Sequence, residues 1–186
     1  YYVDDIKDAI KDVRKELARL KRERQDDSLD EGEIENFKWY MNEVLGDLED
    51  KPVGEELLKE LSKFKEECEI FIEESEIVWA TRVIEGAPDR EIYNVSSVKS
   101  IVKQVDYARS FLLAKGVCVG HLEEIIYAAK VKCSRYRADK KLLAAEIAEK
   151  IGERQKAQKL KLEAQAMLAQ DWREIFKNEN FPNVAT

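Results

Sequence analysis

Apolar residues near the start of the chain recur at the spacing of a helix that packs along one side. From Val3 onward they fall at alternating intervals of three and four, which are the a and d positions of a heptad repeat. This spacing predicts a helix over residues 2–25 with a coiled-coil-like seam. The seam consists of Val3, Ile6, Ile10, Val13, Leu17 and Leu20.

Two different partners would close this seam. Charges of opposite sign flank it, and in a parallel homodimer Glu16 of one chain would face Lys21 of the other. Three heptads are few for an isolated coiled coil, so a helix further along the same chain is the alternative partner. Both remain open at this point. If the chain pairs with itself, the six seam residues are the candidate interface.

The same periodicity predicts four further helices, and no stretch alternates as a strand would. Asp30 and Glu33 have the spacing of a capping box at a helix start. Pro52 and Gly54 mark the turn that follows. The predicted helices span residues 2–25, 31–49, 54–85, 96–115 and 121–177.

The last predicted helix is the longest, because no proline interrupts it. At 1.5 Å per residue it would reach ~85 Å if continuous, and Gly152 leaves a kink open. We therefore expect an all-α fold: an elongated bundle of about five helices in one domain, 1–186, whose first helix and distal last helix form an arm. The apolar seam of the last helix begins with Leu122, Ile126, Ala129, Cys133, Tyr136, Leu143 and Ile147.

Charge is distributed unevenly along the chain. Residues 26–76 contain 19 acidic and 5 basic side chains, whereas residues 130–161 contain 11 basic and 4 acidic ones. One interpretation is that these regions face each other within the chain or across an oligomer. The other is a basic face for nucleic acid or another anionic partner, although the isoelectric point of about 5.1 opposes it. That face would consist of Lys130, Lys132, Arg135, Arg137 and Lys141.

Residues that carry chemistry are scarce. His121 is the one histidine, and no phosphate-binding loop, nucleophile elbow or HExxH helix is found. Cys118, His121 and Cys133 together supply too few ligands for a structural zinc site. We predict no catalytic residue, no metal and no cofactor, and therefore not an enzyme.

Cysteine usage and hydropathy indicate in which cellular compartment we expect the protein. Three widely spread cysteines do not form a disulfide framework, and no apolar run is long enough to span a bilayer. Because the chain begins with Tyr rather than Met, we expect it to be part of a larger protein in the cytoplasm or nucleus. The expected function is a non-catalytic protein–protein interaction, oligomerisation or scaffold module that binds protein partners or forms a homodimer. Nucleic-acid binding is the alternative.

Overall fold

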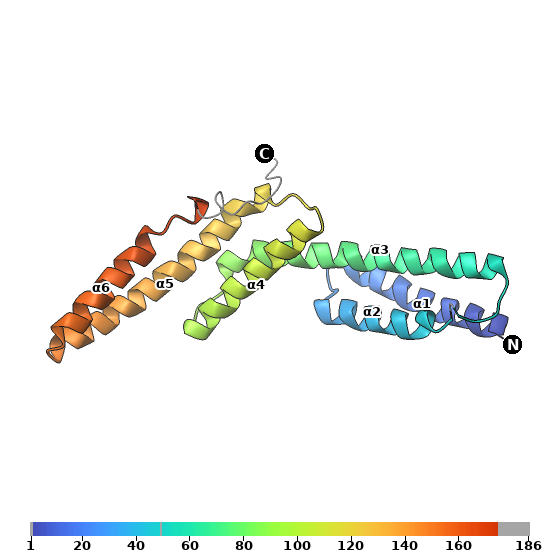
Figure 1. The fold of residues 1–186 in the computed structure, drawn as a ribbon, viewed down its shortest axis with the longest axis horizontal. Coiled ribbons are helices and arrows are strands. Elements are labelled where there is room, and N and C mark those ends of the chain that lie inside the picture. The colour runs from blue at the N-terminus through green and yellow to red at the C-terminus, as the bar shows by residue number, and fades with distance from the viewer. Residues whose placement is uncertain (1, 49, 175–186) are drawn as a thin grey trace. The chain divides into compact units, whose positions relative to one another are not determined.

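The computed structural model describes residues 2–48 and 50–174 (Figure 1). Within these residues the chain folds into helices and no strand, which confirms the predicted all-α class. The helices are α1 (Tyr2–Gln25), α2 (Glu31–Gly46), α3 (Glu55–Gly86), η1 (Ala87–Asp89), α4 (Val95–Ala114), η2 (Gly120–Leu122), α5 (Glu123–Lys150) and α6 (Arg154–Ala169), where η denotes a short 3-10 helix.

The chain divides into two compact units, where the sequence had suggested one domain. Unit 1 is Tyr1–Trp79 and unit 2 is Ala80–Thr186, so the division falls inside α3. The physical reason lies in α3 itself, which contributes apolar side chains over its whole length. Its earlier part buries Leu61 and Phe64 in one core, and its last turns bury Ala80 and Ile84.

Unit 1 consists of α1, α2 and most of α3 around a single apolar core. The seam of α1 enters this core, so the expected arm of first and last helices is replaced by packing of α1 against α2 and α3. The predicted capping box begins α2: the Asp30 carboxylate accepts from the Glu33 amide at 2.8 Å. The core includes Ile6, Ile10, Val13, Leu17, Leu20, Ile34, Phe37, Met41, Leu45, Leu61, Phe64, Cys68, Phe71 and Ile72.

Unit 2 contains the last turns of α3, then η1, α4, η2, α5 and α6. Helix α4 packs against the first half of α5, and the two run in opposite directions (Figure 1). Helix α5 also contacts η1, where the Lys132 ammonium donates to the carbonyl oxygens of Pro88 (2.9 Å) and Arg90 (2.7 Å). A short turn returns the chain as α6, which packs along the second half of α5 (Figure 1).

The helix predicted over 121–177, whose continuity at Gly152 the sequence left open, is interrupted there, because Gly152 ends α5. Gly152 has φ of 86°, and its amide donates to the Glu149 carbonyl (3.1 Å) while the Glu153 amide donates to that of Ala148 (2.9 Å). These two bonds form a Schellman motif, which caps the exposed carbonyls and stops the helix. Residues 175–177 of the predicted helix lie outside the described residues.

We expect opposite effects on stability from substitutions at Gly152 and Asp27, the residues with positive φ that end α5 and α1. Gly152→Ala should cost about 1 kcal/mol, since a side chain at positive φ is strained. Asp27→Gly should instead stabilise unit 1 by roughly 0.5 kcal/mol, because Asp27 ends α1 at φ 62°. Urea unfolding of each variant measures both effects. A loss of stability in both variants would contradict the assignment of strain to Asp27.

Candidate interaction surface

The sequence-predicted seam of α1 is used inside the chain. Five of its residues are at most 3 % exposed, and only Val3, at 42 %, reaches solvent. Aromatic rings of α3 also support α1, since Arg14 lies over the Phe64 ring at 5.0 Å and Arg24 over that of Phe71 at 4.5 Å. The buried residues are Ile6, Ile10, Val13, Leu17 and Leu20. As a homodimer interface they would first have to leave this core, so we do not retain them as candidates.

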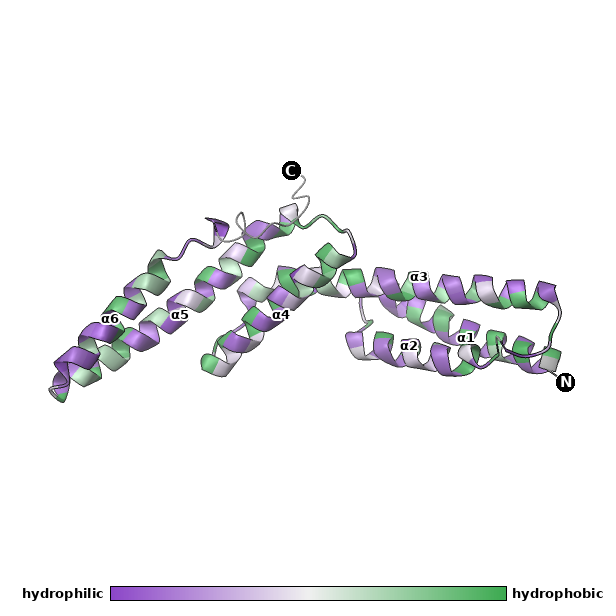
Figure 2. Ribbon diagram, in the orientation of Figure 1, coloured by the Kyte–Doolittle hydropathy of each residue, from purple (hydrophilic) through white to green (hydrophobic). Residues whose placement is uncertain are grey.

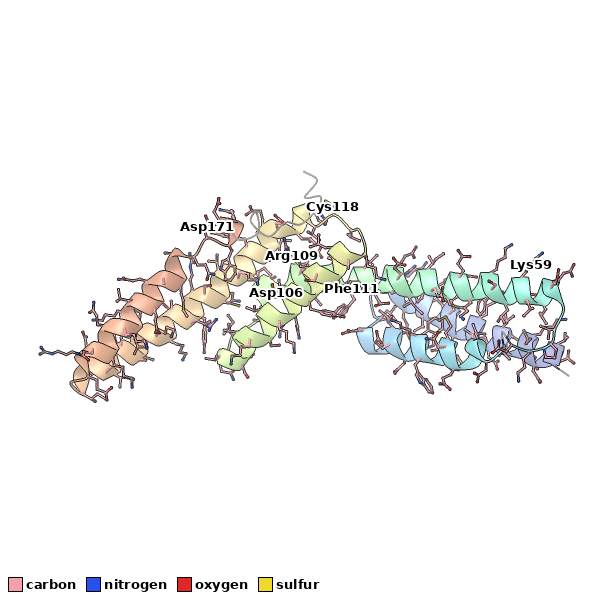
Figure 3. The ribbon with its side chains drawn as sticks, in the orientation of Figure 1. Lys59, Asp106, Arg109, Phe111, Cys118 and Asp171 are labelled. Atoms are coloured by element: carbon pink, nitrogen blue, oxygen red, sulfur yellow. The ribbon has the colours of Figure 1, made fainter. Side chains whose placement is uncertain are left out.

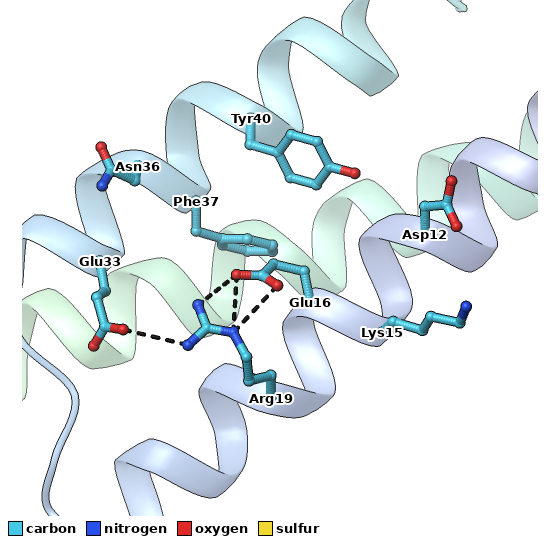
Figure 4. Close-up of a pocket in the computed structure, with 8 residues that line it drawn as sticks. All are labelled: Asp12, Lys15, Glu16, Arg19, Glu33, Asn36, Phe37 and Tyr40. Atoms are coloured by element: carbon cyan, nitrogen blue, oxygen red, sulfur yellow. Dashed lines mark hydrogen bonds and ion pairs between the residues drawn. The ribbon is translucent and has the colours of Figure 1, made fainter.

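A polar groove lies between α1 and α2, and its charges largely satisfy one another (Figure 4). Arg19 donates to both oxygens of Glu16, at 3.1 and 3.2 Å from Nε, and pairs with Glu33 of α2 at 3.3 Å. The Arg19 hydrogen bond holds the pKa of Glu16 below its ordinary value. This arrangement clamps the two helices together.

Most residues of the predicted basic face form ion pairs or hydrogen bonds within unit 2. Lys130 is 5 % exposed and pairs with Asp106 of α4 at 2.5 Å, while Lys132 binds backbone carbonyls and Lys141 pairs with Glu163 at 2.7 Å. Arg135 and Arg137 are exposed, but two residues apart on a helix they point to different sides. The five residues therefore do not converge on one surface for a phosphate backbone.

Asp106 of α4, which is labelled in Figure 3, pairs with the buried Lys130, and we expect substitutions of the two residues to have unequal effects on stability. Asp106→Ala should cost about 2 kcal/mol, because it leaves a buried ammonium without its counter-charge. Lys130→Met should change stability by less than about 1 kcal/mol, since the Met side chain packs on Trp172, whose ring the ammonium now faces at 4.9 Å. Thermal unfolding of the two variants tests this. Equal losses would contradict the burial of Lys130.

The residues considered for metal or thiol chemistry do not come together. Among the described residues, no three His, Cys, Asp or Glu side chains are placed to hold a metal ion. Burial raises the pKa of the Cys68 thiol to about 12, and burial also raises that of Cys133. Cys118 is exposed. The two buried thiols thus behave as small apolar groups of the cores.

Helix α5 has apolar side chains on two sides. One side packs on α6 through small residues, with Ala145 and Ala148 meeting Ala157. The other side follows the predicted seam and is covered in its first half, where Arg109 of α4 pairs with Glu123 at 3.3 Å. Residue numbers fall along α4 as they rise along α5, so α4 begins near Tyr136. The covered seam residues are Leu122, Ile126, Ala129 and Cys133, each at most 3 % exposed.

Beyond the start of α4 the same seam continues without a cover. Leu143 is 52 % exposed, Ile147 is 56 % and Ile151 is 65 %. Their spacing of four residues keeps them on one side of the helix. We call these three residues the open strip. Figure 2 shows apolar positions interleaved with hydrophilic ones along both α5 and α6.

Charged side chains of both signs border the open strip. Lys140 and Lys150 each lie seven residues from a strip residue, on the same side of α5, while the exposed Asp139 and Glu146 lie four residues before and three after Leu143. Lys140 lies 5.5 Å from the ring centre of Tyr136, at the junction of the covered and open halves. The strip is therefore an apolar surface with a mixed charged border.

A further exposed apolar residue, Trp39, was not predicted from the sequence. Trp39 of α2 is 65 % exposed, on the side opposite the buried Phe37 and Met41. Glu35 and Glu43 stand one turn before and after it and are both exposed. The signal was available: a tryptophan out of phase with the apolar face of its helix, between two acidic residues. We call Glu35, Trp39 and Glu43 the acidic face.

Comparison with protein-family models, with curated proteins and with solved structures finds no significant match to this chain. In the described part of the chain, the search for a helix of sufficient length and hydropathy to cross a membrane also finds none. Fold and surface define an all-α protein whose most unusual features are exposed apolar side chains with charged borders.

Proposed function

We propose that this chain is a non-catalytic protein–protein interaction module that acts as a scaffold through charged and apolar helix faces. The open strip is the observation that carries the proposal. A helix normally buries its apolar side, and α5 does so only as far as α4 extends. Large apolar residues left in water next to a formed core are typical of sites that a protein partner covers.

The alternative, a nucleic-acid interface over residues 130–161, has less support. Phosphate binding needs cations that are exposed and converge on one surface. Lys130, Lys132 and Lys141 already hold partners within unit 2. Fewer charges remain for an anionic duplex than the sequence had suggested.

Site-specific photocrosslinking in the intact protein tests the proposal. A photoreactive residue at Ile147 should yield protein adducts, and the same residue at the exposed Gln158 of α6 should yield far fewer. Gln158 is the matched control, because it is exposed on the other helix of the same hairpin and lies outside the strip. Adducts with nucleic acid, or equal adduct yields at both positions, would contradict an interaction surface on the strip.

A further inference from the structure

We infer that the open strip binds the acidic face of a second copy of this chain, so that copies join in head-to-tail order. This inference rests on the proposed function and adds the partner. Both surfaces are on the same polypeptide, one in each unit. The two surfaces complement each other in the charge of their units and in the shape of their apolar side chains.

Charge is the first observation. Unit 1 carries 25 acidic and 13 basic residues and unit 2 carries 14 acidic and 19 basic ones, for net charges of −12 and +5. Unit 1 of one copy and unit 2 of another therefore attract each other. Pairing of the strip with another strip would instead bring two units of net charge +5 together, which costs energy.

The immediate borders of the two surfaces also differ. Glu35 and Glu43 flank Trp39, whereas charges of both signs flank the strip, Lys140 and Lys150 among them. Negative charges repel one another near the acidic face in a single chain. Partial burial raises the pKa of Glu31, and the carboxylates of Glu35 and Glu76 raise it further. Cationic side chains of a second copy would relieve this repulsion.

Apolar content is the second observation. Tryptophan is the residue most often found at the energetic centre of a protein interface, and Trp39 is exposed to 65 %. The open strip presents three branched aliphatic side chains in a row on which an indole ring can lie. The two surfaces differ, so the contact is heterologous and each chain retains one strip and one acidic face for further copies.

Sedimentation velocity of the purified chain tests the inference. The mass should rise with concentration at about 50 mM salt and return toward the monomer at about 0.5 M, because the charged borders are then screened. Ile147→Glu and Trp39→Ala should each weaken the association about tenfold or more. Both residues are exposed, so folding should be unchanged, which circular dichroism verifies.

Mixing the two variants gives the decisive result. Trp39→Ala retains an intact strip and Ile147→Glu retains an intact acidic face, so an equimolar mixture should form a one-to-one complex that grows no further. Leu162→Glu and Tyr107→Ala are matched controls, since both residues are exposed and lie outside the two surfaces. These controls should associate as the unchanged chain does.

Two results would overturn the inference. One is a wild-type chain that stays monomeric at low salt at every concentration. The other is a mixture of the two variants that does not recover the complex, because the strip then pairs with itself or with another partner. If Ile147 still crosslinks to a different protein, the proposed function stands and only the identity of the partner falls.

Discussion

Leu17→Glu is expected to unfold unit 1. Leu17 is 2 % exposed in the core that α1, α2 and α3 share. An unpaired carboxylate there costs more than about 4 kcal/mol, which approaches the whole stability of a small domain. Urea unfolding followed by circular dichroism should show helix loss at lower denaturant, or already in buffer.

Val3→Glu is the matched control for this prediction. Val3 occupies the same heptad position as Leu17, yet it is 42 % exposed, so the substitution should cost less than about 0.5 kcal/mol. The contrary outcome is specific. If Leu17→Glu left the fold intact but lowered the mass in solution, the seam would be an interface between chains and the core described for unit 1 would be wrong.

Truncation at two positions of the α5 seam should give very different losses of stability. Ile126 is fully buried under α4, and Ile126→Ala should cost about 3 kcal/mol through lost burial and the cavity left behind. Ile147→Ala should cost less than about 0.5 kcal/mol, because the Ile147 side chain is 56 % exposed.

Both seam variants are measured by thermal and urea unfolding, at a protein concentration low enough that copies stay apart. Comparable losses at the two positions would mean that something within the chain also covers Ile147. The strip would then not be open, and the basis of the proposed interaction surface would disappear. The comparison is internal, since both substitutions remove the same atoms from the same helix.

The sequence predicted which side of α1 is buried, but it could not identify what covers that side. A heptad pattern reports only that apolar residues share a face. Glu16 and Lys21 fit a homodimer equally well, yet in the structure Glu16 pairs with Arg19 and Lys21 reaches Glu67 of α3 at 3.0 Å. The partner of the seam is determined by contacts between residues far apart in sequence, such as Lys21 and Glu67, and the periodicity of apolar residues does not reveal such contacts.

The fate of Gly152 was similarly undetermined. A glycine within a helix costs only about 1 kcal/mol, so the long pattern around it allowed a continuous helix. Formation of α6 depends on the contact of Ala145 and Ala148 with Ala157, and alanine is too common on all helix faces to reveal such a contact. Six of the seven predicted seam positions lie in α5 and Leu122 ends η2 just before it, but where α4 stops covering them followed only from the structure.

The charged residues left two interpretations open for another reason. The density of basic side chains around Lys130 is compatible with a solvated face, but a lysine can also bury its aliphatic stem and place its ammonium against a partner. Lys130 does this between Asp106 and Trp172. The sequence analysis did not single out Trp39, although its exposure was predictable, because it lies out of phase with the buried Phe37 and Met41 on its helix.

Carbene footprinting of the purified chain over a range of protein concentrations tests whether the open strip is exposed in a single chain and covered by a second copy. Leu143, Ile147 and Ile151 should be labelled strongly in dilute protein, and their labelling should fall progressively, together with that of Trp39, as concentration rises at low salt. Ile126 should stay unlabelled throughout. Protection of Ile147 already at the lowest concentration, or labelling of Ile147 that never falls, would contradict a strip that is open in one chain and covered by the next.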